Sequence, residues 1–172
     1  MRTMYILRGA PGSGKSTWVK NNNLEPYTLS ADNIRLMYQG PVMDESGSFV
    51  ISQGNDGRVW KLLYELLEQR MAKGEFVVVD ATHYKSNLLN KYKKLIADYR
   101  YRAFVVDFTK VPLETVLERN AARDAYKFVP ENVIRKMCAV FEHDTEVNSR
   151  FNVITPDEAV EKLHASLLFD YN

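Results

Sequence analysis

The chain has 172 residues, a length typical of one domain that buries its core without a disulfide or zinc staple. It carries 23 Lys and Arg against 22 Asp and Glu, a net charge of +1. That balance excludes binding of nucleic acid through bulk positive charge, but it is compatible with a local basic cleft. Cys138 is the single cysteine, which excludes a disulfide framework and a four-cysteine zinc site. No apolar run approaches the ~20 residues of a membrane span, so we expect a cytoplasmic protein with no membrane partner.

Strands and helices are predicted to alternate from the first residues onward. Residues 4–7 form an apolar run before a glycine-rich loop, which predicts a buried strand, and a helix follows over 15–20. A second strand is expected at 27–30 and a short helix at 32–38. Residues 39–57 are rich in Gly, Ser and Asp, so we expect an excursion from the core there.

The second half of the chain continues the alternation. Apolar residues at three- and four-residue steps over 58–73 predict an amphipathic helix that Gly74 ends. Further strands are predicted at 76–79, 103–108 and 151–154. Further helices are predicted to begin at Ser86, at Pro112, at Pro130 and at Thr155 or Asp157, the first three ending near 99, 121 and 141. Continuous apolar strands between helices are typical of an α/β fold: a central parallel sheet with helices on both faces and ligands at the carboxyl ends of the strands. No repeat or linker interrupts the chain, so one domain is expected over residues 1–172.

A phosphate loop is predicted directly after the first strand. The segment fits G-x-x-x-x-G-K-[ST] in the strand–loop–helix context that the motif requires. Its residues are Gly9, Ala10, Pro11, Gly12, Ser13, Gly14, Lys15, Ser16 and Thr17. The glycines allow successive backbone N–H groups to surround a phosphate, and the helix N-terminus adds positive potential. Lys15 is expected on the β- and γ-phosphates and Ser16 on Mg²⁺, so the loop predicts binding of a nucleoside triphosphate with Mg²⁺. The chain has no guanine-reading N-K-x-D motif, so ATP is the expected nucleotide.

Two aspartates end buried strands and are candidates for the acidic residue beside Mg²⁺. Asp80 is followed by the small and polar Ala81 and Thr82, as expected where ligands bind. Asp107 is followed by Phe108 and a helix start, which favours a helix-capping role for it. The sequence therefore favours Asp80.

Asp32 and Arg35 follow the second predicted strand and share one face of a helix if Asp32 opens it. A carboxylate beside the γ-phosphate accepts a hydroxyl proton, and a neighbouring arginine holds an anionic acceptor. The alternative is an N-cap aspartate with a surface ion pair, and the spacing alone does not separate the two interpretations.

Positive residues also gather near the end of the helix over 112–121. Arg119 and Arg123 are four residues apart, and Lys127 follows in a polar and aromatic loop. Arginines in such a lid neutralise a transferring phosphoryl group, whereas the alternative is a solvated charged face. Tyr126 and Phe128 either stack on adenine or pack on the neighbouring helix.

A further basic cluster is a candidate path for a phosphate backbone, with a charged helix face as the alternative. It consists of Lys85, Lys91, Lys93, Lys94, Arg100 and Arg102.

Several motifs together resemble the kinase domain of the 5′-hydroxyl polynucleotide kinases, the bacteriophage and bacterial end-healing enzymes. They are G-A-P-G-S-G-K-S-T at 9–17, S-A-D-N-I-R at 30–35, V-V-D-A-T at 78–82, E-R-N-A-A-R at 118–123 and V-P-E-N-V-I-R-K-M at 129–137. Their order and spacing fit from about residue 4 to residue 155. The resemblance implies a P-loop kinase fold with an arginine-bearing lid, and transfer of the ATP γ-phosphate to the 5′-OH end of RNA or DNA.

The same resemblance implies roles for individual residues. Asp32 would be the general base on the 5′-hydroxyl, and Arg35 would hold the phosphate that follows the acceptor nucleoside. Asp80 and Thr82 would line the junction of the metal and acceptor sites. Arg123 would be the lid arginine on the ATP phosphates, although the loose alignment also allows Arg119 in that role.

Two alternative functions stay open. A P-loop kinase acting on a nucleoside, sugar or antibiotic hydroxyl uses the same Asp32 and Arg35, and a non-catalytic NTP-binding module uses only the phosphate loop. Kinases of this family are often fused to a phosphatase or a ligase, and neither a D-x-D-x-T nor a K-x-D-G motif occurs in the chain. A phosphatase or ligase module or partner is thus a further expectation.

Overall fold

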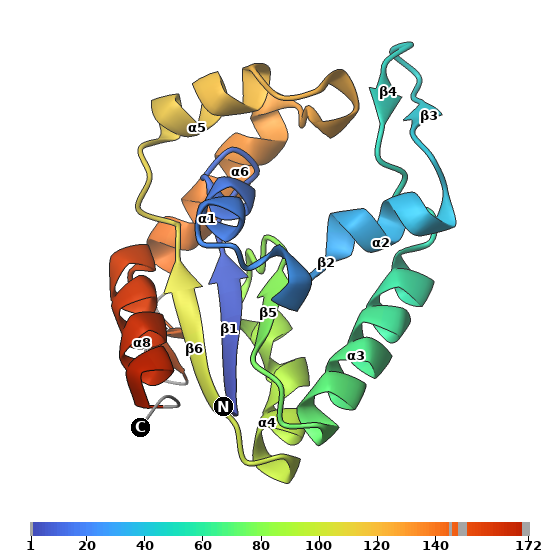
Figure 1. Cartoon of the computed structure of the whole chain (residues 1–172). Coiled ribbons are helices and arrows are strands. Elements are labelled where there is room, and N and C mark those ends of the chain that lie inside the picture. Colours follow the sequence, from blue (N-terminus) through green and yellow to red (C-terminus); the bar gives the residue numbers. More distant parts are fainter. Residues whose placement is uncertain (1, 145, 148–150, 170–172) are drawn as a thin grey trace.

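The computed structural model describes residues 2–144, 146, 147 and 151–169, which fold around a five-stranded sheet (Figure 1). The strands are β1 (Thr3–Arg8), β2 (Thr28–Ser30), β5 (Val77–Asp80), β6 (Arg102–Asp107) and β7 (Asn152–Ile154). They lie in the order β2-β5-β1-β6-β7, and every pairing is parallel, as predicted. The chain adds β2 and β5 on one side of β1 and then crosses to β6 on the other. The carboxyl end of β1 is therefore the point where the strand order reverses, which is where ligands bind in such sheets.

Helices cover both faces of this sheet. One face is covered by α1 (Lys15–Asn21) and α8 (Pro156–Phe169), and the other by α3 (Asp56–Ala72), the 3₁₀ helix η2 (Ser86–Tyr92) and α4 (Lys93–Asp98). The remaining helices are α2 (Ala31–Tyr38), α5 (Leu113–Ala121), α6 (Glu131–His143), and the 3₁₀ turns η1 (Glu25–Tyr27) and η3 (Ala125–Lys127). None of the helices in the described part of the chain has the length and apolar character needed to cross a bilayer.

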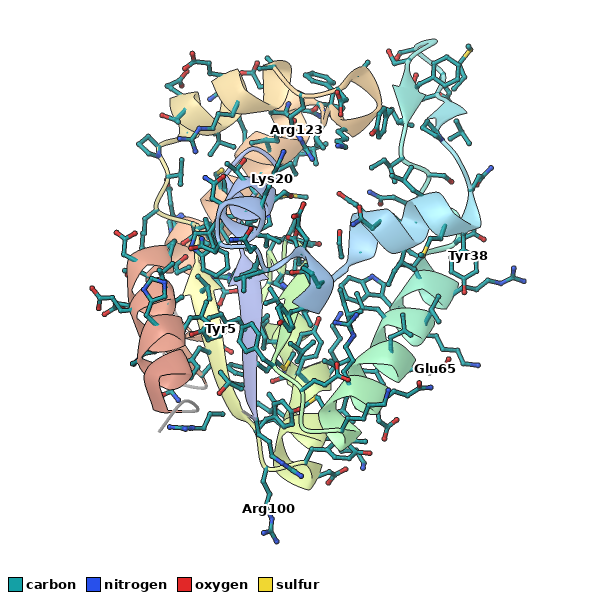
Figure 2. All side chains as sticks on the ribbon, viewed as in Figure 1. Tyr5, Lys20, Tyr38, Glu65, Arg100 and Arg123 are labelled. Atoms are coloured by element: carbon teal, nitrogen blue, oxygen red, sulfur yellow. The ribbon has the colours of Figure 1, made fainter. Side chains whose placement is uncertain are left out.

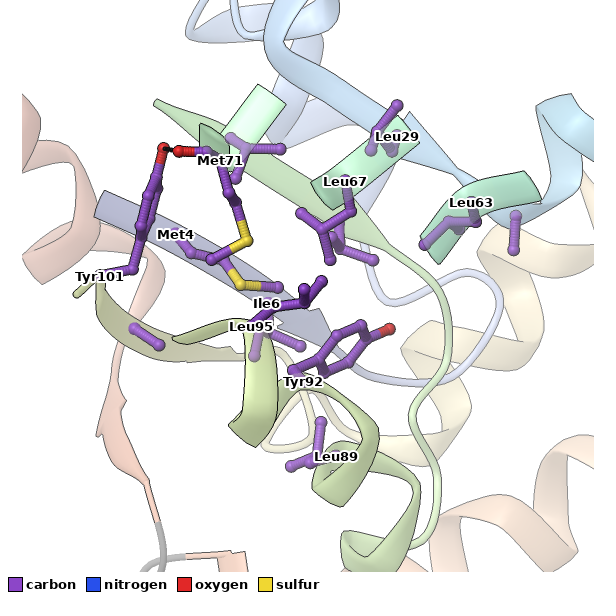
Figure 3. Close-up of a cluster of buried hydrophobic side chains, with 14 of the residues drawn as sticks. Met4, Ile6, Leu29, Leu63, Leu67, Met71, Leu89, Tyr92, Leu95 and Tyr101 are labelled. Carbon is purple, nitrogen blue, oxygen red and sulfur yellow. Dashed lines mark hydrogen bonds between the residues drawn. The ribbon is translucent and has the colours of Figure 1, made fainter. Parts of the chain in front are cut away.

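Strand β1 supplies both halves of the core because its successive side chains point to opposite faces. Met4 and Ile6 pack under α3 and α4, and Tyr5 and Leu7 pack under α1 and α8. Figure 3 shows the first half, in which Met4 and Ile6 meet side chains from α3, η2 and α4. The continuous apolar strands in the sequence are thus explained by burial on both faces.

The segment predicted as one helix from Ser86 to residue 99 is divided into η2 and α4. Its buried residues recur every three positions: Ser86, Leu89, Tyr92 and Leu95. A period of three suits a 3₁₀ helix, whose side chains at i and i+3 are aligned. Ser86 is not the N-cap, because its backbone N–H donates to the Asp144 carboxylate at 2.6 Å.

The predicted excursion at residues 39–57 contains a small hairpin of β3 (Val42–Met43) and β4 (Phe49–Val50). Asp44 holds its turn by accepting hydrogen bonds from the backbone N–H groups of Ser46 and Ser48. The hairpin lies at the same end of the molecule as the loop that joins α5 to α6 (Figure 1). The two are connected by a hydrogen bond from the Ile51 N–H to the Tyr126 carbonyl at 3.2 Å. Helix α3 then begins at Asp56, two residues earlier than predicted.

His83 is buried under the carboxyl end of the sheet as a neutral side chain. Its Nδ1 donates to the Leu7 carbonyl at 2.7 Å, and its Nε2 lies 2.8 Å from the Tyr92 hydroxyl. Burial lowers the pKa of His83 to about 3, although the Leu7 carbonyl opposes this shift; the positive charges of Lys91, Lys15 and Arg8 lower the pKa further. Below pH 6.5 an unfolded histidine binds a proton that the folded one does not, so this group destabilises the fold as the pH falls.

We expect a measurable pH dependence from this residue. Between pH 6.5 and 4.5 the wild type should lose about 2–3 kcal/mol more unfolding free energy than His83→Gln, at about 1.4 kcal/mol per pH unit. Urea unfolding at both pH values measures this difference. The exposed His164 provides the control, since His164→Gln should follow the wild type. Equal losses in the wild type and His83→Gln would contradict the prediction.

Candidate active site

The phosphate loop connects β1 to α1 at the centre of the sheet edge. Gly12 and Gly14 have φ angles of 88° and 99°, in the left-handed region that favours glycine. A Cβ atom at Gly12 would also lie 2.5 Å from the Val116 carbonyl oxygen of α5. The loop conformation and the close approach of α5 therefore both require glycine at position 12.

Two polar side chains of the loop fit a bound phosphate. The Ser13 hydroxyl is buried and has no hydrogen-bond partner among the described protein atoms. The Lys15 ammonium donates to the carbonyls of Gly9 and Ala10 at 2.8 and 3.1 Å, so one of its three N–H donors stays free. Burial lowers the pKa of Lys15, while the nearby Asp80 carboxylate opposes this shift. A triphosphate would supply anionic oxygens to which both the Ser13 hydroxyl and the Lys15 ammonium can donate.

Ser16 and Asp80 are brought together as a pair of oxygen ligands. Asp80 ends β5 opposite Leu7 of β1, and its Oδ2 lies 3.4 Å from the Ser16 Oγ. Hydroxyl and carboxylate oxygens are the donors that Mg²⁺ prefers, so the pair fits the expected metal. Burial raises the pKa of Asp80, and the Lys15 ammonium opposes this shift. Asp107, the other candidate, instead accepts hydrogen bonds from the N–H and hydroxyl of Thr109 at 2.8 and 2.6 Å.

Thr82 lies in the loop after β5, next to the phosphate loop. Its carbonyl accepts a hydrogen bond from the Gly9 N–H at 3.1 Å, and its side chain is half-buried. The contact holds the segment that carries Asp80 against the start of the phosphate loop.

Asp32 lies in the first turn of α2 but does not cap the helix. The cap is Ser30, whose hydroxyl accepts from the Asn33 N–H at 3.3 Å. The charge of Asp32 raises the pKa of both Lys15 and Asp80, so its carboxylate lies within electrostatic reach of the phosphate loop. The N-cap interpretation of Asp32 is therefore wrong.

Arg35 connects Asp32 to a third acidic residue, Asp56, at the start of α3. Its Nε and one terminal nitrogen bind the two Asp56 oxygens at 2.7 and 3.0 Å, and its other terminal nitrogen binds Asp32 at 2.8 Å. The Arg35 side chain is 13% exposed, whereas those of Asp32 and Asp56 are 50% and 37% exposed, so the guanidinium is largely buried while both carboxylates contact solvent. Two N–H donors of the guanidinium remain for a substrate, and the three side chains together carry a net charge of −1.

Arg119 lies in the last turn of α5, and Arg123 lies two residues beyond the end of this helix. The charge of Arg123 lowers the pKa of both Lys15 and Asp80, so Arg123 lies within electrostatic reach of the site. Arg119 lies against the phosphate loop, with a terminal nitrogen 3.4 Å from the position of a Cβ on Gly14. Lys127 is paired with Asp124 at 3.1 Å and is not directed at the site.

The basic cluster predicted between residues 85 and 102 does not form one surface. Arg100 lies at the opposite end of the molecule from Arg123 (Figure 2), and Arg102 begins β6 at that same end. Lys91 is half-buried with its ammonium 3.2 Å from the centre of the Trp60 ring, and burial lowers its pKa to about 8. The cluster therefore offers no continuous path for a phosphate backbone.

Two functional candidates were missed from the sequence. Asp56 lies in a stretch rich in Gly and Asn, and its pairing with Arg35 spans 21 residues. Asn120 carries a buried amide in the middle of the arginine motif. For Asn120, the only signal available in the sequence was a polar residue at an otherwise apolar helix position.

Sequence comparison relates the chain to known proteins over most of its length. A family model described as "AAA domain" matches residues 4–143. A protein of Autographa californica nuclear polyhedrosis virus described as a bifunctional polynucleotide kinase/RNA ligase is 29% identical, covering 87% of this chain and 23% of that protein. An L-seryl-tRNA(Sec) kinase of Methanococcus maripaludis is 31% identical, covering 81% of this chain and 52% of that protein. The chain thus spans about half or less of the length of these curated relatives.

Solved structures show the same fold. A chain from the Pnkp1/Rnl/Hen1 complex superposes with a TM-score of 0.56 at 25% identity, covering 68% of this chain and 38% of that chain. A gluconokinase from Sinorhizobium meliloti 1021 superposes with a TM-score of 0.53 at 18% identity, covering 99% and 98% of the two chains. The second likeness concerns the fold alone. The predicted fold class, an α/β P-loop kinase fold with a parallel sheet between helices, is confirmed.

Proposed function

Since the chain belongs to this AAA domain family over residues 4–143, we propose that it transfers the γ-phosphoryl group of ATP to the 5′-hydroxyl end of RNA or DNA. The observation that carries the proposal is the position of Asp32 in the first turn of α2, where Arg35 binds its carboxylate at 2.8 Å and its charge acts on Lys15 and Asp80. A non-catalytic NTP-binding module has no need of a carboxylate at the acceptor side, whereas a kinase uses one to accept the hydroxyl proton. The sequence motifs and the similarity to a polynucleotide kinase/RNA ligase support the 5′-OH end as the acceptor.

Each residue then has a defined part in the transfer. Lys15 and the N–H groups of the phosphate loop hold the β- and γ-phosphates, and Arg123 neutralises the charge that spreads over the transferring group. Asp32 orients the acceptor hydroxyl and takes its proton as the new P–O bond forms and the bond to the ADP oxygen breaks. Ser16 and Asp80 would hold Mg²⁺, which supplies further charge neutralisation when bound. Arg35 fixes the Asp32 carboxylate and keeps two donors for an anionic acceptor.

A small-molecule hydroxyl is the second candidate acceptor, favoured by the charge of the hairpin segment. Residues 36–57 contain Asp44, Glu45 and Asp56 and no Lys or Arg, so they repel a polyanion. The similarity to an L-seryl-tRNA(Sec) kinase adds the seryl hydroxyl of a charged tRNA as a separate candidate, which the charge of this segment does not favour.

The discriminating experiment uses γ-labelled ATP, Mg²⁺ and a set of acceptors. The set contains a 5′-OH RNA, the same sequence as DNA, their 5′-phosphorylated forms, seryl-tRNA, nucleosides and gluconate. Label on the 5′-OH strands alone would support the proposal, and the RNA to DNA ratio would define the substrate class. Label only on seryl-tRNA or a small hydroxyl would replace it with the second candidate. A product strand with a 5′-phosphate is a ligase substrate, so a ligase or phosphatase module or partner is part of the proposal.

Asp56 should act as a positioning residue for Asp32. Asp56→Asn weakens the bidentate bond to Arg35, so we expect kcat to fall about tenfold while KM for ATP stays within about twofold. Steady-state kinetics with saturating acceptor measure both constants. Glu131→Gln, which removes the carboxylate of an exposed pair with Arg135, is the matched control and should change neither. An unchanged kcat in Asp56→Asn would show that Asp32 is oriented without this pair.

A further inference from the structure

Asn120 lies between the two lid arginines, in the last turn of α5, and is 2% exposed. Both ends of its amide are used on one residue. The Asn120 Nδ2 donates to the Val129 carbonyl at 2.8 Å, and the Val129 N–H donates to the Asn120 Oδ1 at 3.1 Å. A buried amide with both groups satisfied by one backbone unit holds that unit in a single position.

This double hydrogen bond closes the loop that carries Arg123. Residues 122–128 lead from α5 towards α6, and the Asn120 side chain joins the two ends of this loop. The Arg123 N–H also donates to the Asn120 carbonyl at 3.3 Å. The backbone of Arg123 is therefore attached directly to the residue whose side chain holds the loop. Val129 packs against the buried cluster that includes Ala10 of the phosphate loop.

The backbone of Asn120 also lies against the phosphate loop. A Cβ on Gly12 would lie 2.5 Å from the Val116 carbonyl oxygen and 3.2 Å from the Asn120 nitrogen, so the backbones of α5 and the loop are in direct contact. The end of α5 that carries Asn120 therefore packs directly on the phosphate loop. The charge of Arg123 reaches Lys15 and Asp80 from this position.

We propose that Asn120 is a positioning residue that holds the lid loop so that Arg123 reaches the transferring phosphoryl group. The inference rests on the proposed function, because it gives Arg123 a role in phosphoryl transfer. Asn120 itself is not expected to contact the substrate. The effect of Asn120 passes through Arg123, which distinguishes it from a residue that only stabilises the fold.

The test compares Asn120→Ala, Arg123→Ala and the double variant. Asn120→Ala should lower kcat by about tenfold or more, with KM for the acceptor within about twofold, because a small displacement of a charge-stabilising group has effects of this size. In the Arg123→Ala background the same change should lower kcat by less than about twofold, since the residue it positions is gone. Asn120→Leu keeps the buried volume and removes both hydrogen bonds, so it replaces Asn120→Ala in the test if that variant does not fold. Tyr101→Phe, which removes hydroxyl bonds to the Met71 and Glu75 carbonyls, is the control for lost stability and should keep kcat.

A second readout does not depend on the acceptor. Trypsin cleaves after Arg123 and Lys127, and Mg²⁺-ATP should protect these bonds in the wild type but about tenfold less in Asn120→Ala or Asn120→Leu. If the wild type phosphorylates no 5′-OH strand while this difference in protection is found, the positioning role stands and the proposed acceptor fails. Additive losses in the double variant, or equal protection in wild type and variants, would overturn the proposal.

Discussion

Asp32→Asn should lower kcat by about 10²–10⁴-fold and leave KM for ATP within about twofold. Asparagine still accepts the hydrogen bond that Arg35 donates at 2.8 Å, so the side chain keeps its place in α2. It lacks the negative charge needed to take the hydroxyl proton. The loss should therefore appear in the chemical step and not in nucleotide binding.

Steady-state kinetics and direct titration of ATP separate these two effects. Asp98→Asn makes the same chemical change at an exposed carboxylate paired with Lys94, and it should leave both constants unchanged. Loss of ATP affinity in Asp32→Asn would place Asp32 on the donor side and remove the general base from the mechanism. A normal kcat would remove it from the reaction altogether.

The order of strands and helices could be predicted because burial on both sides of a parallel sheet leaves continuous apolar runs such as 76–79. The hairpin at residues 42–50 could not, since its two-residue strands are too short to produce an alternating pattern. The division into η2 and α4 was also missed. Leu89, Tyr92 and Leu95 fit a helical stripe of either kind, and only the observed spacing of burial identifies the 3₁₀ helix.

The phosphate loop could be located from the sequence because its residues are contiguous and follow a strand. Asp32 and Arg35 were paired correctly for a similar reason, since three residues of helix place them on one face. Arg35 was expected to be available to an anionic acceptor. Its hydrogen bonds to Asp56 could not be predicted, because they depend on how α3 packs against α2. The prediction of one basic surface was wrong although its residues are close in sequence. Lys91 packs on the Trp60 ring, whereas Arg100 lies at the end of the molecule opposite Arg123 (Figure 2).

The shared guanidinium also bears on the acceptor. Arg35 lies between two carboxylates, so it presents a substrate with two directed donors and little net positive charge. Such a group recognises one phosphate or hydroxyl by geometry and contributes little to long-range attraction. We therefore expect weak dependence of acceptor KM on salt, in contrast to proteins that follow a phosphate backbone with many lysines.

Lys15→Met should abolish phosphoryl transfer, with kcat reduced about 10³-fold or more, and should leave the fold intact or slightly more stable. The side chain keeps its length and apolar stem, but it no longer carries the charge that neutralises the β- and γ-phosphates. In the free protein that charge is buried, and burial lowers its pKa, so the ammonium is held at a cost to the fold. The cost is partly offset by the carbonyls of Gly9 and Ala10 and by Asp80.

Thermal unfolding and transfer assays on the same preparation would measure both effects. Lys20→Met alters an exposed lysine in the same helix and should change neither activity nor stability beyond about 0.5 kcal/mol. Retained turnover in Lys15→Met would exclude the phosphate loop as the donor site. A large loss of stability would mean that the ammonium is a structural bridge between two loop carbonyls and not a strained group kept for catalysis. Lost activity with retained stability in Lys15→Met would indicate that the Lys15 charge contributes to phosphate binding and transfer and not to the stability of the fold.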